Sequence, residues 1–490
     1  MTRRALLVAA AALAAVVLVL LLRGARFASK QLAVAPALPV EVDASGLAQR
    51  LAGGLRIPTV SSSDRSRVDA SAFRRFHRYL RDSYPALHEV LERERVSDAS
   101  LLYTWRGRRD DLRPVLLLAH QDVVPVEAGT EGDWTQLPFG GRVADGYVWG
   151  RGAMDDKGSL FCILEAAEAL VAAGFRPERT VMLAFGDDEE VGGDSGAAAI
   201  ADLLQARGIE VEYVLDEGGA IAVDVLSNVE VAVALIGIAE KGSATVELRV
   251  ETDGGHSSTP PRHTAVGLVS RGVAALESEP MRGEIDGATQ LMFAYVGPEL
   301  SFPYRVVLAN LWLFRGLLEW ALAREPATDA MLRTTTAATV IEGGVKENVL
   351  PIRARATVNF RILPGDTIAG VVEHVRAVVA DERVRVELNR RPPPRNPSPI
   401  SPVESESFTA LQRTIGEVFP DAVVAPYLVL GGTDARHYGA LTDDLYRFSP
   451  FVYTRDDRRR IHGTDERIAV DKLSDAVRFY MRLIRSTAGS

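Results

Sequence analysis

The pattern of hydrophobic and polar residues predicts an α/β arrangement in the first half of the chain. Residues 114–120, 180–185 and 211–215 are short continuous apolar runs, as in strands that are buried on both faces of a parallel sheet. Residues 158–174 and 195–207 lie between these runs and are predicted helices. The alternation predicts an α/β domain with a mainly parallel sheet, in which ligands bind at the carboxyl ends of the strands.

The pattern changes in the middle of the chain. Residues 244–251 and 354–362 alternate apolar and polar side chains, which indicates strands with one solvated face. Predicted helices at 264–277 and 367–380 accompany them. We therefore expect a small α+β domain of the ferredoxin-like kind, inserted into the first domain.

The expected organisation has five parts. Six prolines in the stretch 391–402 are typical of a stiff linker. The N-terminal segment covers residues 1–30, and the two parts of the α/β domain cover residues 45–240 and 403–490. Between these two parts lie the inserted domain, at 241–390, and the linker, at 391–402.

The N-terminal segment is a candidate membrane anchor. Residues 5–22 form an uncharged run that, as a helix, would span roughly 27 Å, close to the thickness of a bilayer core. Arg3 and Arg4 precede the run, and no clean small-x-small cleavage site ends it. We expect an uncleaved anchor with the body of the protein exported, and a cleaved signal peptide with a secreted body is the alternative.

Charge and cysteine content restrict the chemistry. The 490 residues include 65 Asp and Glu against 56 Lys and Arg, a net charge of −9, which excludes a basic nucleic-acid-binding protein. Cys162 is the only cysteine, so the chain has no intramolecular disulfide and no metal cluster held by several cysteines. A metal site would have to use histidines and carboxylates.

Acidic or histidine-containing clusters follow the apolar segments at four places. They are His120-Gln121-Asp122, Asp155-Asp156 in a Gly-rich turn, the four acids 187–190, and Asp216-Glu217. Helix capping or a solvated charge run would explain any one of them. Four such clusters at one sheet edge would repel one another unless a cation neutralised them. Carboxylate and imidazole ligands favour zinc, with manganese or cobalt as alternatives, and His462 is a candidate for a further ligand.

The motifs HQD, GRGAMDDKG, DDEEVGG, LDEGG and IHGTDE occur in this order. The series resembles that of the co-catalytic zinc peptidases, a family that includes aminoacylase-1, carboxypeptidase S and glutamate carboxypeptidase. The resemblance covers almost everything after residue 45. Residues 239–243, 255–258, 332–337 and 357–362 resemble most closely the carboxypeptidase S branch, and within it the secreted N-fatty-acyl-amino-acid synthase/hydrolases.

The resemblance implies a dizinc centre. Asp155 would bridge the two ions, with a cis peptide bond between Asp155 and Asp156. His120 and Asp216 would complete one zinc site, whereas Glu190 and His462 would complete the other. Glu189 would be the general acid/base, and Asp122 would orient His120. The two neighbouring glutamates can have different roles only if the backbone turns between them, and Gly192 and Gly193 permit such a turn.

The resemblance also implies that the inserted domain is a lid and dimerisation domain. His256 would stabilise the oxyanion, in the site of a partner subunit or in its own site after closure. Arg361 would bind the free carboxylate of the substrate, although a structural ion pair is the ordinary interpretation of an arginine in a strand. Asn348, Gly432 and Thr433 are further candidates for the substrate pocket.

Three functional hypotheses follow. The first is a membrane-anchored dizinc hydrolase of N-acyl amino acids or small peptides, and the second is a carboxypeptidase S-like dipeptidase. A binding protein without catalysis is the alternative from a different class. The apolar stretch 291–330, with Phe302, Trp312, Phe314 and Trp320, would line a tunnel for a long acyl chain or pack between helices of the lid.

Overall fold

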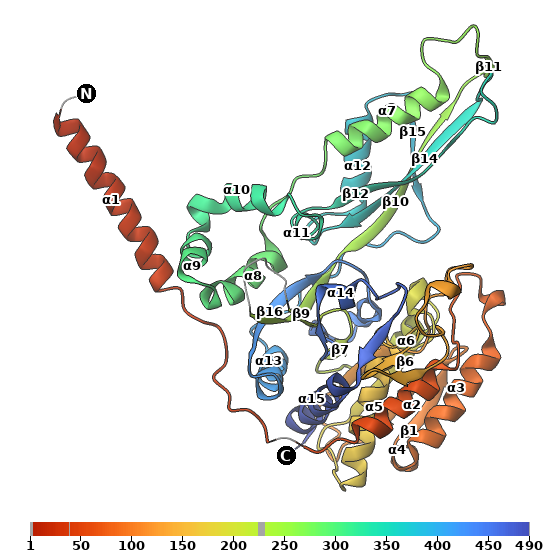
Figure 1. The fold of residues 1–490 in the computed structure, drawn as a ribbon, viewed down its shortest axis with the longest axis vertical. Coiled ribbons are helices and arrows are strands. Elements are labelled where there is room, and N and C mark those ends of the chain that lie inside the picture. The colour runs from red at the N-terminus through yellow and green to blue at the C-terminus, as the bar shows by residue number, and fades with distance from the viewer. Residues whose placement is uncertain (1–2, 39, 224–230, 490) are drawn as a thin grey trace.

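The computed structural model describes residues 3–38, 40–223 and 231–489 (Figure 1). It shows a large α/β domain, a smaller antiparallel domain above it, and one helix, α1 (Arg3–Ala25), that projects away from both. The predicted fold class is thereby confirmed.

A ten-stranded mixed sheet forms the centre of the large domain. Its strands follow the order β1-β2-β6-β3-β7-β17-β9-β8-β18, and β16 pairs with β9. The strands that carry the site, β6, β3, β7 and β17, run parallel to one another. The bounds are β1 (Glu92–Val96), β2 (Ser100–Trp105), β3 (Val115–His120), β6 (Val181–Gly186), β7 (Val214–Asp216), β8 (Ile221–Ala222), β9 (Ala232–Glu240), β16 (Ala422–Val429), β17 (Leu445–Arg447) and β18 (Val452–Tyr453).

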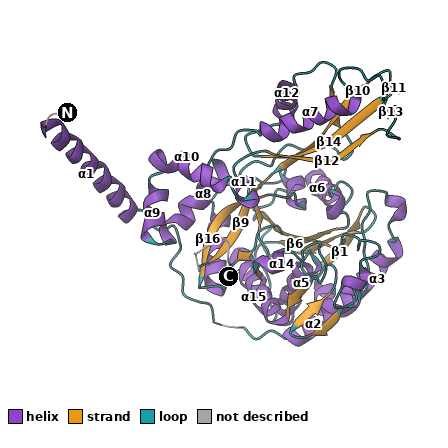
Figure 2. Cartoon of the chain, turned by 45° about the horizontal axis from the view of Figure 1, so that its top comes forward, coloured by secondary structure: helices purple, strands orange, loops and turns teal. Residues whose placement is uncertain are grey.

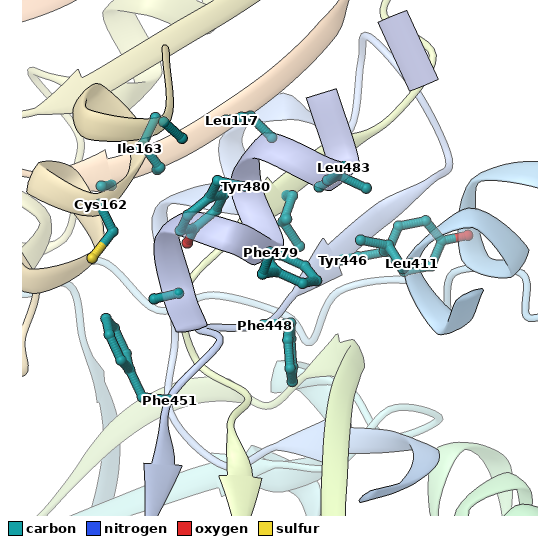
Figure 3. Packing of buried hydrophobic residues seen from close by; sticks show 14 of the residues in the cluster. Leu117, Cys162, Ile163, Leu411, Tyr446, Phe448, Phe451, Phe479, Tyr480 and Leu483 are labelled. Carbon is teal, nitrogen blue, oxygen red and sulfur yellow. The ribbon is translucent and has the colours of Figure 1, made fainter. Parts of the chain in front are cut away.

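Helices cover both faces of this sheet. One face packs against α2 (Ala44–Leu55), α5 (Lys157–Ala172), α13 (Glu406–Val418) and α15 (Val470–Ala488), with α3 (Ala70–Ser83) and α4 (Pro85–Val90) beside them. Figure 3 shows Phe479 and Tyr480 of α15 among side chains from α5, α13 and the sheet. The other face packs against α6 (Ala197–Ala206). Since apolar side chains alternate between the two faces of each strand, both faces of the sheet are buried.

The smaller domain contains a four-stranded antiparallel sheet (Figure 2). Its strands are β10 (Gly242–Glu251), β12 (Thr335–Gly343), β14 (Arg353–Ile362) and β15 (Arg385–Asn389), in the order β12-β14-β10-β15. Its helices, α7 (Ala265–Ser278) and α12 (Ile368–Val379), share one apolar core with the sheet. This β-α-β-β-α-β order is ferredoxin-like. At its far end, β11 (Gly255–His256) pairs with β13 (Val349–Leu350).

The apolar stretch between α7 and β12 forms four helices: α8 (Gly287–Val296), α9 (Phe302–Ala309), α10 (Leu311–Leu322) and α11 (Pro326–Asp329). Phe293, Val296 and Leu308 belong to the large hydrophobic core, and α8 packs against β16. The expectation that this stretch packs between the helices of the lid is therefore wrong. Figure 1 shows α8 and α9 between the large domain and the lower end of α1.

Short elements complete the fold. A three-stranded sheet of β4 (Arg142–Ala144), β5 (Tyr147–Trp149) and β19 (Arg467–Ala469) lies beside the loops of the site, and α14 (Arg455–Arg458) precedes β19. The proline-rich stretch 391–402 runs along the ends of β9 and β10. Ser243 and Arg395 exchange two backbone hydrogen bonds there, and the peptide bond before Pro392 is cis.

Candidate metal centre

The last residue of β3 begins the candidate site. His120 is buried, and its Nδ1 lies 3.0 Å from the backbone carbonyl of Asp122 and 3.4 Å from that residue's carboxylate. The same carboxylate accepts hydrogen bonds from the backbone N–H groups of Glu189 and Glu190, both at 3.2 Å. Asp122 therefore connects the end of β3 to the acidic turn after β6.

Asp155 lies between two histidines. Its Oδ1 is 2.9 Å from Nε2 of His120, and its Oδ2 is 3.0 Å from Nε2 of His462. The peptide bond between Asp155 and Asp156 is cis, as the resemblance implies. One carboxylate thus presents each of its oxygens to a different imidazole, from residues more than 300 positions apart in the sequence.

The four acids after β6 divide into two pairs. Asp187 binds Ser100 Oγ and the Arg65 guanidinium, while Asp188 accepts the N–H groups of Ser195 and Gly196. The other pair, Glu189 and Glu190, begins a short turn that ends at Gly192 and Gly193, where φ is +116° and +67°.

The second pair faces the histidines. Glu190 Oε2 is 3.0 Å from Nε2 of His462, and Glu190 Oε1 is buried without a hydrogen-bond partner. Glu189 groups with His120 and Glu217 instead. The backbone turn expected at the two glycines is present and allows neighbouring side chains to point to different partners.

The structure places Asp216 differently from the expectation. Its two carboxylate oxygens accept the backbone N–H groups of Glu217, at 2.9 Å, and Ala435, at 2.6 Å. The donor atom that lies near His120 and Glu189 comes from the next residue, Glu217, which is not among the expected site residues. The signal for Glu217 was present in the motif LDEGG, but the motif does not show which of two adjacent acids faces the site.

The donor atoms fit metal ions. His120, Asp155 and Glu190 form one group, and His120, Glu189 and Glu217 form another; within each group the donor atoms lie within 4.8 Å of one another. Metal–ligand bonds of roughly 2.0 to 2.1 Å in a tetrahedral site place neighbouring donors about 3.3 Å apart. The separations of 2.9 to 3.0 Å around Asp155 are close to that value. The unpartnered Glu190 Oε1 is the kind of buried atom that a cation would satisfy.

Burial and charge shift the pKa values of these groups in opposite directions. Burial, reinforced by neighbouring carboxylates, raises the pKa of both Glu189 and Glu217 well above the usual range. Hydrogen bonds to Asp155 and Glu190 raise the pKa of His462 to about 10. Burial acts to raise the pKa of Asp155, but hydrogen bonds to the two histidines outweigh this effect and hold the pKa well below its usual value. This concentration of perturbed groups is typical of a functional site.

Glu466 supports the loop that carries Asp155. Its side chain is fully buried and accepts hydrogen bonds from the backbone N–H groups of Met154, at 2.9 Å, and Asp155, at 3.3 Å. Its other oxygen lies 2.7 Å from the guanidinium of Arg151, which also donates to the backbone carbonyl of His462 at 3.1 Å. Glu466 and Arg151 thus connect two of the candidate ligands.

A pocket of about 940 Å³ lies between these residues and the start of the smaller domain. Glu189, Glu190 and His462 line it, together with Arg361 and Gly432 as expected. Its lining also contains three further arginines, Arg391, Arg395 and Arg436, and no residue of the stretch 291–330. Lys241, which also lines the pocket, donates a hydrogen bond to the backbone carbonyl of Ala330 at the end of this stretch, at 2.9 Å. An acyl tunnel along the stretch stays a prediction.

Thr433 does not line this pocket. It is buried, and its hydroxyl and backbone N–H donate to Glu240, which Arg447 also contacts at 3.0 Å. A role in direct contact with substrate does not agree with this position. Thr433 instead holds the loop that places Gly432 at the pocket.

His256 and Asn348 lie together at the far end of the smaller domain. His256 pairs with Val349 across β11 and β13, and the backbone N–H of Ser257 donates to the carbonyl of Asn348. Figure 1 shows β11 at the tip most distant from the large domain. His256 is exposed. Neither residue lines the pocket beside the candidate metal ligands in this arrangement.

Comparison with known proteins agrees with this geometry. The family described as "Peptidase family M20/M25/M40" matches residues 116–486. The chain is 40% identical over 478 residues to "Probable carboxypeptidase S-like 2" of Dictyostelium discoideum, covering 96% of this chain and 91% of that one. It is 39% identical over 451 residues to "N-fatty-acyl-amino acid synthase/hydrolase PM20D1" of Xenopus tropicalis, covering 91% and 87%.

The fold also matches a solved structure. The M20 family metallo-carboxypeptidase Sso-CP2 from Sulfolobus solfataricus superimposes with a TM-score of 0.65 at 18% identity. The match covers 91% of this chain and 99% of that one. At this identity the likeness concerns the fold alone.

Proposed function

Because the chain belongs to peptidase family M20/M25/M40 and is thus an enzyme of the metallopeptidase type, we propose that it is a two-zinc hydrolase. Its proposed reaction is cleavage of the amide bond of N-acyl amino acids, or of small peptides with a free carboxylate. The observation that carries the proposal is the position of Asp155, whose two oxygens face His120 and His462 separately. A carboxylate in this position is suited to bridging two cations.

The proposed ligands follow the contacts. Asp155 would be shared, with Glu190 and His462 on one side and His120 and Glu217 on the other. Zinc is the leading choice for this set of nitrogen and oxygen donors, with manganese or cobalt as alternatives. When bound, the ions would polarise the substrate carbonyl and make water a stronger nucleophile at neutral pH.

Glu189 is the proposed general acid/base. Its backbone is held by Asp122, and its carboxylate lies near His120 and Glu217 at the pocket wall. Burial raises its pKa well above the usual range, so the side chain favours the protonated form after it has accepted a proton. Such a group can take a proton from the attacking water and deliver it to the departing nitrogen.

The arginines of the pocket are the proposed binding site for the substrate carboxylate. Arg361 and Arg391 line the pocket, and neither guanidinium group forms a hydrogen bond or ion pair with another described residue. Arg395, by contrast, is paired with Asp194 at 2.6 Å. A free guanidinium can bind a carboxylate through two parallel hydrogen bonds. We assign the carboxylate to Arg361, with Asn348 and His256 contributing only if the tip of a lid approaches, from a partner subunit or from the same chain after closure.

We also propose that the smaller domain is a lid through which two subunits pair. His256 lies at the tip of that domain, away from the pocket of its own chain. It would reach the site of a partner subunit, or its own after closure, to stabilise the oxyanion. Measurement of the mass in solution, and of the activity of a mixture of His256→Ala and Glu189→Gln subunits, tests this pairing.

The substrate class is best addressed by direct comparison. The name of the Xenopus tropicalis relative supports N-fatty-acyl amino acids, whereas that of the Dictyostelium discoideum relative favours a carboxypeptidase S-like dipeptidase as second candidate. The zinc-loaded protein should be assayed with an acyl-chain series on one amino acid, from acetyl to oleoyl, and with dipeptides ending in that amino acid. Preference for dipeptides would support the second candidate. Absence of hydrolysis in both series, with two zinc ions bound, would refute both proposed substrate classes.

The proposed location is a membrane with the catalytic body exported. Helix α1 is long and apolar enough to cross a membrane, by length and composition only, and no residue of its apolar window is buried in the structure. A signal sequence passes the same test, so the alternative is a secreted protein without α1. The N-terminal sequence of the mature protein distinguishes the two.

A further inference from the structure

Helix α10 has an unusual solvent-exposed face. Its exposed residues recur at the spacing of one helix face and are all apolar, glycine or alanine, namely Trp312, Leu313, Gly316, Leu317, Trp320 and Ala321. The two charged residues of α10 point inward instead. The Glu319 carboxylate accepts a hydrogen bond from the backbone N–H of Ile285 at 2.9 Å, and the Arg315 guanidinium donates to the backbone carbonyl of Ile285 at 2.6 Å. The charged side of this helix faces the protein.

This orientation is the reverse of that of an ordinary surface helix. In a helix on the surface of a globular protein, the polar face is exposed and the apolar stripe faces the core. Helix α3 of the same chain follows this rule, with Phe73, Phe76 and Leu80 buried. Large side chains on the outer face of α10 remain 49 to 62% exposed. A contiguous apolar face of this kind marks a site of interaction with another apolar surface.

Contacts with α1 indicate what this surface is. The side-chain amide of Asn310, the residue before α10, donates to the carbonyl of Leu20 at 3.1 Å, and Arg23 donates to the carbonyl of Ala309 at 3.2 Å. A Cβ on Gly24 would lie only 2.6 Å from Val306, so α1 and α9 approach closely there. Figures 1 and 2 both show α9 at the lower end of α1.

The position of this contact along α1 sets its depth in a membrane. From Arg3 to Leu20 the helix rises roughly 26 Å, close to the thickness of the hydrocarbon core. If α1 spans a bilayer, Asn310 and the start of α10 therefore lie at its boundary. Tryptophan is enriched at this depth, and the guanidinium of Arg324 lies over the Trp320 ring at 3.6 Å, with its charge available to headgroups.

We propose that the outer face of α10, together with Phe302 and Tyr304 at the start of α9, is a membrane-docking surface that lies in the bilayer interface beside α1. This inference rests on the proposed membrane span of α1 and goes beyond it, because it fixes how the body sits on the membrane. The occupant is lipid, since the surface is continuous with the base of the span and combines apolar, aromatic and basic side chains. Such a helix inserts roughly 5 to 10 Å into the boundary between headgroups and acyl chains.

Single-cysteine labelling of the full chain tests the proposal. Cys162 is buried, and Cys162→Ala provides a background without reactive thiols. In this background, Leu317→Cys on α10, Leu13→Cys on α1 and Val345→Cys on the smaller domain each receive a fluorophore. Val345 is the matched control, because it is an apolar side chain that is 93% exposed. The zinc-loaded variants are reconstituted into vesicles of phosphatidylcholine and phosphatidylglycerol that carry a doxyl group on an acyl chain.

The expected result is a loss of emission at position 317 comparable with that at position 13, and none at position 345. Quenching at 13 alone would overturn the docking surface while leaving the span intact, whereas no quenching at 13 would overturn the span itself. Equal quenching at 317 and 345 would indicate nonspecific adsorption and also contradict the proposal. Protection of position 317 from both doxyl lipid and aqueous iodide would show that a second copy of the chain covers the face instead. A label at Phe302→Cys repeats the test on α9 if the variant at 317 does not fold.

Discussion

Substitution of Glu466 tests whether the metal ligands are positioned by a buried ion pair. The Glu466 carboxylate accepts three hydrogen bonds, from the guanidinium of Arg151 and from the backbone N–H groups of Met154 and Asp155. Glu466→Gln keeps one carbonyl oxygen for the backbone donors but removes the charge opposite Arg151. Breaking a buried pair by removing one partner costs about 3 to 5 kcal/mol. We expect the lower end of this range for Gln and the upper end for Glu466→Ala, which removes all three acceptor contacts.

The effect on metal binding should be separate from the effect on folding. Loss of a partner behind a metal ligand typically weakens metal affinity by about 10- to 100-fold, which corresponds to roughly 1.4 to 2.7 kcal/mol. Both ligands that the pair supports, Asp155 and His462, would become less well oriented. Zinc affinity is measured by competition with a chromogenic chelator, and the free energy of unfolding by urea titration of metal-depleted and zinc-loaded protein.

Two controls make the reasoning refutable. Glu92 forms an ion pair with Arg106 at 2.6 Å on the surface, so Glu92→Gln should leave zinc affinity unchanged. In a double-mutant cycle, the double variant Arg151→Met/Glu466→Gln should lose less free energy of unfolding than the two single variants lose in sum, because the two residues act as a pair. If Glu466→Gln and Glu466→Ala lower the stability but bind zinc with wild-type affinity, Glu466 has no positioning role.

Four further predictions concern the site itself. Glu189→Gln should abolish turnover while leaving two zinc ions bound, as measured by metal analysis, and unchanged activity would refute its role as base. Glu217→Gln should reduce the zinc content of the purified protein, whereas Asp216→Asn should affect its unfolding in urea more than its metal content; the reverse order would restore Asp216 as the ligand. Because the pKa of His462 is raised to about 10, zinc must displace a proton from this side chain at neutral pH. Zinc affinity should therefore rise with pH. Calorimetry in buffers of different ionisation enthalpy measures the proton release. In metal-depleted protein the stabilisation from protonated His462 should be complete below its unfolded pKa of about 6.5 and lost as the pH rises through about 10, as followed by urea titration.

Local patterns predicted the elements of the fold closely. The stretches 244–251 and 354–362 correspond to β10 and β14 within two residues at each end, because alternation along a half-buried strand is a local property. The pairing of β9 with β16 could not be predicted, since these strands lie almost 200 residues apart and are joined only in the folded state. The position of α8 on β16 was missed for the same reason. An apolar stretch shows that it will be buried, but not against what.

The candidate site was predicted in part. The motifs identified His120, Asp155, Glu190 and His462, and the structure brings these four together. They could not distinguish Asp216 from Glu217, because successive side chains at the end of a strand point to opposite sides and the expected strand ends one residue before β7 does. The segment 211–215 was expected to be a strand throughout, yet β7 begins only at Val214.

Backbone donors explain which acids are available to a metal. The carboxylates of Asp122, Asp188 and Asp216 each accept two backbone N–H groups, so their oxygens are already satisfied. Among the described residues, none donates a hydrogen bond to the carboxylates of Glu189 and Glu217. A sequence shows where acids cluster, whereas the path of the backbone decides which of them are already hydrogen-bonded. A buried carboxylate without such donors requires a cation or a proton, and this requirement favours the unpartnered glutamates over Asp122, Asp188 and Asp216 as metal ligands or proton carriers.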